Sequence, residues 1–150
     1  ETSSKGLELD VMGKISQNFS VTANYAYNDA VFESTPADSD FQEGDTRQNA
    51  PKHQGGLFAK YSILDGGLKG ISLNFGTNFV SERNSIDGPE LVFPSYTIAD
   101  FGVSYQVDKF VLRATVNNIF DKTHWVGGYN YVRMFPGAPR NYLLSVGYTF

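Results

Sequence analysis

The feature that most constrains the fold is the recurring alternation of apolar and polar side chains in about seven runs of about ten residues each. Alternation with a period of two places the two sets on opposite faces of a β-strand. Helical periodicity is hard to find, so the sequence predicts an all-β chain. The run that closes the chain shows the pattern clearly, because its apolar face carries Tyr142, Leu144, Val146, Tyr148 and Phe150.

The connections between these runs alternate between short and long along the chain. Short turns are expected at 16–18, 65–70 and 108–109, and long connections at 33–51, 81–94 and 121–139. Antiparallel strands that follow one another bring the turns to one rim and the long loops to the other, as in outer-membrane β-barrels. We therefore predict an antiparallel up-and-down transmembrane β-barrel segment, with a soluble β-sandwich as the weaker alternative.

The composition of the two faces agrees with a membrane barrel. Charged residues fall on one face, which suits an aqueous lumen better than a packed core; they are Glu8, Asp10, Lys14, Asp100 and Arg113. Aromatic residues gather near the ends of the runs, at the height expected of interfacial girdles; they are Phe19, Tyr25, Tyr27, Phe79, Tyr96, Tyr105, Phe110, Tyr142, Tyr148 and Phe150.

Several classes of function are disfavoured by composition. The chain has no cysteine, which excludes disulfides, zinc-thiolate sites and thiol nucleophiles. Its net charge is −4 without a basic cluster, so no nucleic acid is expected as a partner. His53 and His124 lie far apart, and the acidic stretch 38–45 does not have the ligand order of a calcium loop. We expect no enzyme activity, no resident cofactor and no structural metal.

Four phrases resemble the family of TonB-dependent outer-membrane siderophore receptors. They are SKGLELDVMGKISQNFSVTANYAYNDA, NAPKHQGGLFAKYSI, VNNIFDKTHWVGGY and GAPRNYLLSVGYTF. The resemblance implies that residues 1–150 are the C-terminal segment of a 22-stranded β-barrel, whose plug domain and N-terminal strands lie outside this chain. A small self-contained porin-like or adhesin-type barrel is the alternative function.

The resemblance also implies a location and partners. The location is the outer membrane of a Gram-negative bacterium, and the function is TonB-energised uptake of a ferric siderophore. The expected partners are the ferric siderophore, the TonB complex through the region outside this chain, the barrel-assembly machinery and outer-membrane lipid. Tyr148 and Phe150 are expected to form the signal that the assembly machinery reads.

The last long connection is the best candidate for ligand binding, because it combines aromatic side chains with one cation. Trp125, Tyr129, Tyr131 and Phe135 are predicted to hold a ligand by stacking and phenolic hydrogen bonds. Arg133 is predicted to attract an anionic ferric complex, and His124 to face the ligand. The alternative is that these aromatic residues only pack the loops together or belong to the upper girdle.

Overall fold

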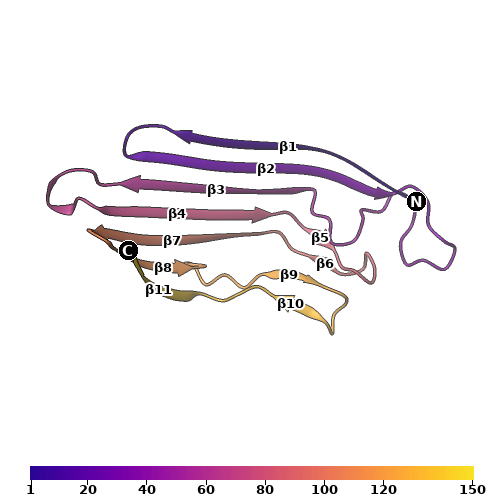
Figure 1. The fold of residues 1–150 in the computed structure, drawn as a ribbon. Coiled ribbons are helices and arrows are strands. Elements are labelled where there is room, and N and C mark those ends of the chain that lie inside the picture. The colour runs from indigo at the N-terminus through magenta and orange to yellow at the C-terminus, as the bar shows by residue number, and fades with distance from the viewer.

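The computed structural model covers residues 1–150 and is built around one single-layered sheet with loops gathered at one end (Figure 1). The sheet has seven strands in the order β1-β2-β3-β4-β7-β8-β11, and every neighbouring pair is antiparallel. The strands are β1 (Thr2–Lys14), β2 (Phe19–Phe32), β3 (His53–Ser62), β4 (Ile71–Val80), β7 (Tyr96–Val107), β8 (Phe110–Asn117) and β11 (Asn141–Tyr148). The predicted all-β class and the seven strands of the sheet are confirmed.

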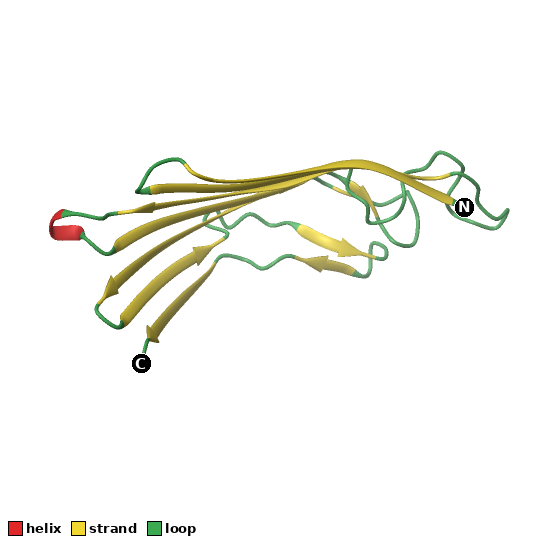
Figure 2. Ribbon diagram, turned by 45° about the horizontal axis from the view of Figure 1, so that its top comes forward, coloured by secondary structure: helices red, strands yellow, loops and turns green.

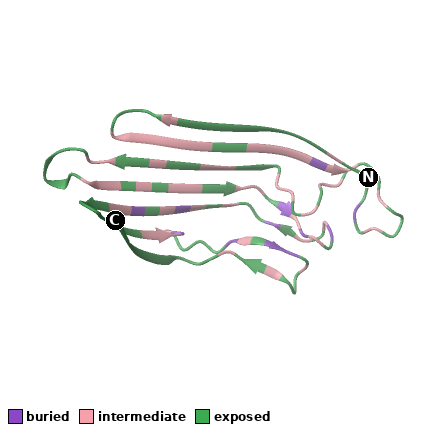
Figure 3. Ribbon diagram, in the orientation of Figure 1, coloured by how far each residue is buried: buried purple, intermediate pink, exposed green.

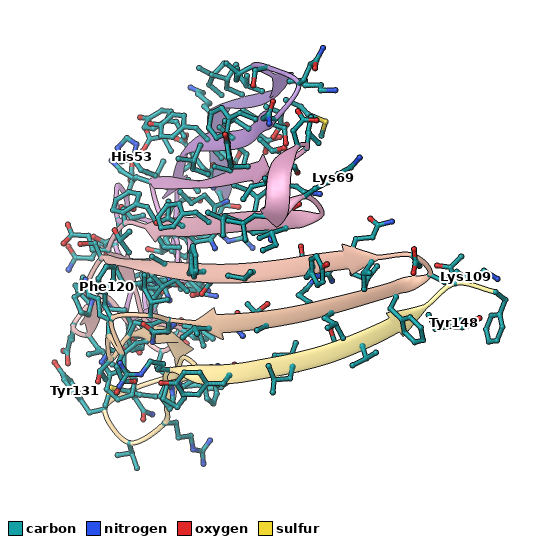
Figure 4. All side chains as sticks on the ribbon, turned by 90° about the vertical axis from the view of Figure 1, so that its left-hand side faces the viewer. His53, Lys69, Lys109, Phe120, Tyr131 and Tyr148 are labelled. Atoms are coloured by element: carbon teal, nitrogen blue, oxygen red, sulfur yellow. The ribbon has the colours of Figure 1, made fainter.

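The turns and loops alternate as expected. One rim carries three short turns, of which the second contains the 3-10 helix η1 (Gly66–Leu68) and the third consists of Asp108 and Lys109. Figure 4 places Lys69 and Lys109 at this end and His53, Phe120 and Tyr131 at the opposite end. No helix in the structure is long and apolar enough to cross a membrane.

Two of the long loops contain small hairpins that the sequence did not predict. β5 (Arg83–Asn84) pairs with β6 (Val92–Phe93), and β9 (Trp125–Gly128) pairs with β10 (Met134–Pro136). Strands of two to four residues are too short to display a periodic pattern. Their existence therefore depends on contacts within the loops.

The strand register joins the apolar residues into one continuous face. Leu9 lies opposite Tyr25, Phe75 opposite Phe101, and Leu144 opposite Ala114. Only 12 of the 150 residues are buried (Figure 3), and no second layer covers the sheet. A soluble β-sandwich, which would bury this face against a second sheet, is therefore wrong. An apolar face of this extent is suited to hydrocarbon.

The opposite face is polar, as predicted. One row of register partners combines Lys60, Asn74, Gly102 and Thr115. A groove of about 550 Å³ runs over this face, and Lys60, Asp100 and Arg113 are among its lining residues. Phe58 is an apolar exception in the same groove. This composition suits the aqueous side of a barrel wall.

The sheet is open. β1 and β11 are its two edges and do not pair with each other, and the strands fan out in an arc between them (Figure 2). A closed barrel removes both edges, whereas an open sheet leaves two rows of unpaired backbone groups. The seven strands of this chain thus form a piece of wall and do not close into a small barrel of their own.

Candidate functional site

The three long loops are connected into one assembly, which we call the loop cap (residues 33–52, 81–95 and 118–140). The Asn49 amide donates to the Asn84 carbonyl at 2.9 Å. The Ile86 amide donates to the Gly128 carbonyl at 3.1 Å, and the Asp87 amide donates to the Tyr129 carbonyl at 3.0 Å. Backbone hydrogen bonds between segments so distant in sequence fix the loops relative to one another.

Hairpin β9–β10 carries most of the predicted ligand-binding residues. Its tip is shaped by Asn130, whose side-chain oxygen accepts the amides of Val132 and Arg133 at 3.0 and 3.2 Å. Such a turn is typical of asparagine, whose side chain imitates a backbone turn. Gly128 is required next to this tip, at the end of β9, because a Cβ there would lie 2.7 Å from both the Phe93 ring and the Arg133 carbonyl.

The structure brings part of the predicted set together. The rings of Tyr129 and Phe135 meet edge to face with centroids 6.0 Å apart. The Tyr131 hydroxyl donates to the Glu90 carbonyl at 3.2 Å. Tyr129 and Tyr131 both line a cavity of about 250 Å³ where the three loops meet. The side chain of Arg133 is exposed and makes no hydrogen bond or ion pair.

The electrostatic character of this cavity differs from the sequence-based expectation. Its lining includes the carboxylates Asp40, Asp87 and Glu90, and no Lys or Arg. Asp87 accepts a hydrogen bond from the Asn130 side chain at 2.8 Å. The predicted cation, Arg133, is not among the lining residues, so it does not offset the negative charge at this position.

His124 and Trp125 lie apart from the tyrosine cavity. His124 is 6% exposed, its Nδ1 lies 3.1 Å from the Lys122 carbonyl oxygen, and its ring packs against Tyr96 with centroids 4.7 Å apart. Trp125 contributes its backbone carbonyl to a contact with Arg83. Tyr96, expected in the interfacial girdle, therefore lies under the loop cap instead, because its position in β7 has the parity of the polar face.

Arg83 is the residue that sequence reasoning missed. It is only 4% exposed, and its Nε donates to Asn49 Oδ1 at 3.1 Å while its Nη2 donates to the Trp125 carbonyl at 2.7 Å. Its guanidinium carbon lies 5.7 Å from the ring centroids of both Phe93 and Tyr96. Burial lowers the pKa of Arg83, and the electrostatic interaction with Tyr96 opposes this to a smaller extent. A single arginine in a polar loop gives no sequence signal of this role.

The two residues expected to form the assembly signal lie at the turn rim, where Tyr148 ends edge strand β11 and Phe150 follows it. Tyr148 packs on Phe110 with centroids 4.9 Å apart and meets Phe150 edge to face at 5.2 Å. The Lys109 ammonium lies 5.9 Å from the Tyr148 ring centroid. Phe150 is fully exposed, so its side chain is accessible to another macromolecule.

Comparisons with known proteins agree with this architecture. Residues 1–119 match the family model described as TonB dependent receptor-like, beta-barrel. The metal-pseudopaline receptor CntO of Pseudomonas aeruginosa is 33% identical over 97% of this chain and 20% of its own length. The ferrioxamine receptor of Yersinia enterocolitica is 31% identical over 100% of this chain and 21% of its own length.

Solved structures show the same fold. The ferric preacinetobactin receptor BauA of Acinetobacter baumannii superposes with a TM-score of 0.82 at 25% identity, over 98% of this chain and 22% of that one. The ferric-catecholate import receptor Fiu of Escherichia coli gives 0.84 at 22% identity, over 99% and 21%. The chain spans about a fifth of the length of the curated relatives it matches. It belongs to the TonB-dependent receptor β-barrel family of the Gram-negative outer membrane.

Proposed function

We propose that this chain is the C-terminal part of the barrel wall of a receptor that takes up a ferric siderophore, or a related metal chelate, with energy delivered through TonB. The observation that carries the proposal is the sheet itself, which has one continuous apolar face, one polar face and two unpaired edges. Such a sheet needs lipid on one side and further strands at both edges. The names of the relatives, which include ferrioxamine and metal-pseudopaline receptors, support the class of cargo.

The chemistry of this function is binding and passage, without covalent catalysis. The polar face of the wall would line the route of the chelate, and the region outside this chain would supply the plug and the TonB contact, as the family resemblance implies. No group of three or more His, Asp or Glu side chains is arranged to hold a metal ion. In this proposal the iron arrives and leaves as part of its chelator.

The loop cap is the proposed place of first contact with the chelate. Tyr129, Tyr131 and Phe135 offer aromatic faces and phenolic hydroxyls on one hairpin. Arg133 remains a proposed contact at the exposed tip of that hairpin, outside the acidic cavity. His124 and Trp125 are proposed to act from beneath, because His124 is buried and Trp125 contributes through its carbonyl group.

The C-terminal aromatic residues are proposed to serve assembly. Tyr148 and Phe150 lie at the turn rim, which faces the periplasm in barrels of this type. The barrel-assembly machinery would bind them there before β11 pairs with the first strand of the complete barrel. The exposed apolar face would then contact outer-membrane lipid.

Growth of a receptor-deficient strain tests the proposed function. The full-length receptor is expressed in that strain with ferrioxamine B, ferrichrome, a ferric pyoverdine, a ferric catecholate or metal-loaded pseudopaline as the sole source of the metal. Growth is expected on one chemical class, and it should be lost when the TonB gene is deleted. Growth on none of these chelates, with the receptor present and folded in the outer membrane, would contradict the proposal.

The contribution of the hairpin is tested with a matched pair of variants. Tyr129→Ala combined with Tyr131→Ala is expected to weaken binding of the transported chelate by about tenfold or more, since each aromatic contact is worth roughly 1 kcal/mol. Tyr142→Ala, on the apolar face of β11, is the control and should leave affinity unchanged. Equal affinities of all three receptors would remove this hairpin from the binding site.

A further inference from the structure

Arg83 joins all three loops of the loop cap at a second place, outside the tyrosine cavity. It belongs to β5 in the loop 81–95, and it binds Asn49 in the loop 33–52 and the Trp125 carbonyl in the loop 118–140. Its two partners are 34 and 42 residues away in sequence. No other side chain in the chain makes hydrogen bonds to both of the neighbouring long loops.

The surroundings of Arg83 are unusual for a buried charge. Neither of the two ion pairs in the chain includes this residue, and its Nη1 atom is buried without a hydrogen-bond partner. Burying a guanidinium is costly unless it is paired. The compensation comes from two hydrogen bonds to neutral oxygens and from the aromatic rings of Phe93 and Tyr96. The guanidinium of Arg83 thus contacts four residues, which are Asn49, Phe93 and Trp125 in the three loops and Tyr96 at the start of β7.

We propose that Arg83 is a positioning residue that fastens the three loops into one rigid cap and thereby fixes where hairpin β9–β10 lies. That Arg83 joins the loops follows from the contacts above. That fixing the hairpin matters for ligand contact rests on the proposed function. The adjacent backbone bonds, from Ile86 to Gly128 and from Asp87 to Tyr129, would depend on this fastening because they join the same two segments.

The geometry predicts which substitutions matter. A lysine at this position keeps the charge but has one compact donor group, which does not reproduce a planar fork reaching two oxygens in different loops. An aspartate at position 49 would give the buried cation a charged partner at 3.1 Å from Nε. Asn49 has φ +51°, a conformation that aspartate tolerates better than most residues, so Asn49→Asp is compatible with the backbone.

Hydrogen–deuterium exchange of the full-length receptor in detergent tests the proposal without any ligand. The variants are Arg83→Met, Arg83→Lys and Asn49→Asp, with Arg47→Met as the control, because Arg47 is an exposed arginine whose side chain makes no hydrogen bond. Arg83→Met and Arg83→Lys should accelerate exchange of the Ile86 and Asp87 amides by about tenfold or more. Arg47→Met should not, and Asn49→Asp should slow the exchange.

A double variant makes the result decisive. The protective effect of Asn49→Asp must disappear when Arg83→Met is also present, since it depends on the guanidinium. The proposal is overturned if Arg83→Met exchanges like Arg47→Met, or if Asn49→Asp acts equally with and without Arg83. Should Arg83→Met fail to assemble, Asn49→Asp alone decides, because unchanged or faster exchange in that variant also overturns the proposal. Faster exchange in Arg83→Met with unchanged chelate uptake would instead leave the fastening in place and count against the proposed role of hairpin β9–β10 in ligand contact.

Discussion

A pair of adjacent leucines in β11 offers a direct test of which face of the sheet meets lipid. Leu144 lies on the apolar face opposite Ala114, and Leu143 lies on the polar face opposite Thr115. Both side chains are largely exposed in the sheet, at 81% and 58%. Replacing each with arginine in the full-length receptor makes the same chemical change in the same strand, and only the direction of the side chain differs.

The expected loss of stability in Leu144→Arg follows from the position of Leu144 between the two rows of interfacial aromatic residues. It lies two residues from Tyr142 and four from Tyr148. At about 3.3 Å per residue and a tilt of about 40°, these spacings put it roughly 5 and 10 Å inside the two rows. Arginine facing lipid at that depth costs about 2–3 kcal/mol, which lowers the folding equilibrium constant by about 30- to 150-fold. Leu143→Arg faces water and should cost about 1 kcal/mol or less.

Folding of the receptor into phosphatidylcholine vesicles over a urea series measures the difference. The folded fraction is obtained from the gel mobility of unheated samples, because intact β-barrels migrate differently from unfolded chains. The curve for Leu144→Arg should shift to lower urea, and the curve for Leu143→Arg should stay near the wild type. If Leu143→Arg loses as much stability as Leu144→Arg, the assignment of the two faces is refuted.

Two further predictions concern backbone conformations that particular residues permit. Gly70 has φ +93°, and a Cβ there would meet the Gln106 carbonyl. Gly70→Ala should therefore lower the free energy of unfolding by about 2 kcal/mol or more in the same urea series. Gly67→Ala is the control and should lower it far less, because the space around Gly67 is open. Asn118, at φ +51°, bonds Lys122 through both its amide nitrogen and its oxygen and also reaches Ala138. Asn118→Ala and Asn118→Gly should both accelerate proteolysis of the loop 118–140, because both remove these side-chain hydrogen bonds. If Asn118→Gly is cleaved at the wild-type rate, only the backbone angle matters and the prediction is wrong.

The sheet was predictable because its signal is local. Side chains alternate between the two faces of a strand, so the apolar face can be predicted from each strand by itself. The observed pairing then places Leu9 opposite Tyr25 and Phe75 opposite Phe101. The alternation of short and long connections predicts that the turns lie at one rim of the sheet and the long loops at the other. The position of Tyr96 near the end of its strand suggests the interfacial girdle. Its even-numbered position, however, places it on the same face as Asp100 and Gly102, which is the polar face.

The loop cap was not predictable in the same way. Its defining contacts join residues such as Arg83 and Trp125, which are 42 positions apart and have no periodic relation. The tyrosines of the hairpin were identified because aromatic side chains are conspicuous in a polar loop, and two of them do line the cavity. Its acidic lining comes from two different loops, with Asp40 in one and Asp87 and Glu90 in the other, so no single stretch of sequence reveals it.

The near absence of a buried core has a consequence for biogenesis. With four buried hydrophobic residues in the whole chain, little apolar area is withdrawn from water when these strands pair. Burial of apolar side chains in a core, which drives the folding of globular domains, therefore contributes little to the stability of this sheet. Most of the apolar surface of this part of the wall can be withdrawn from water only by contact with lipid, so we expect its strands to acquire stable structure together with their entry into the bilayer.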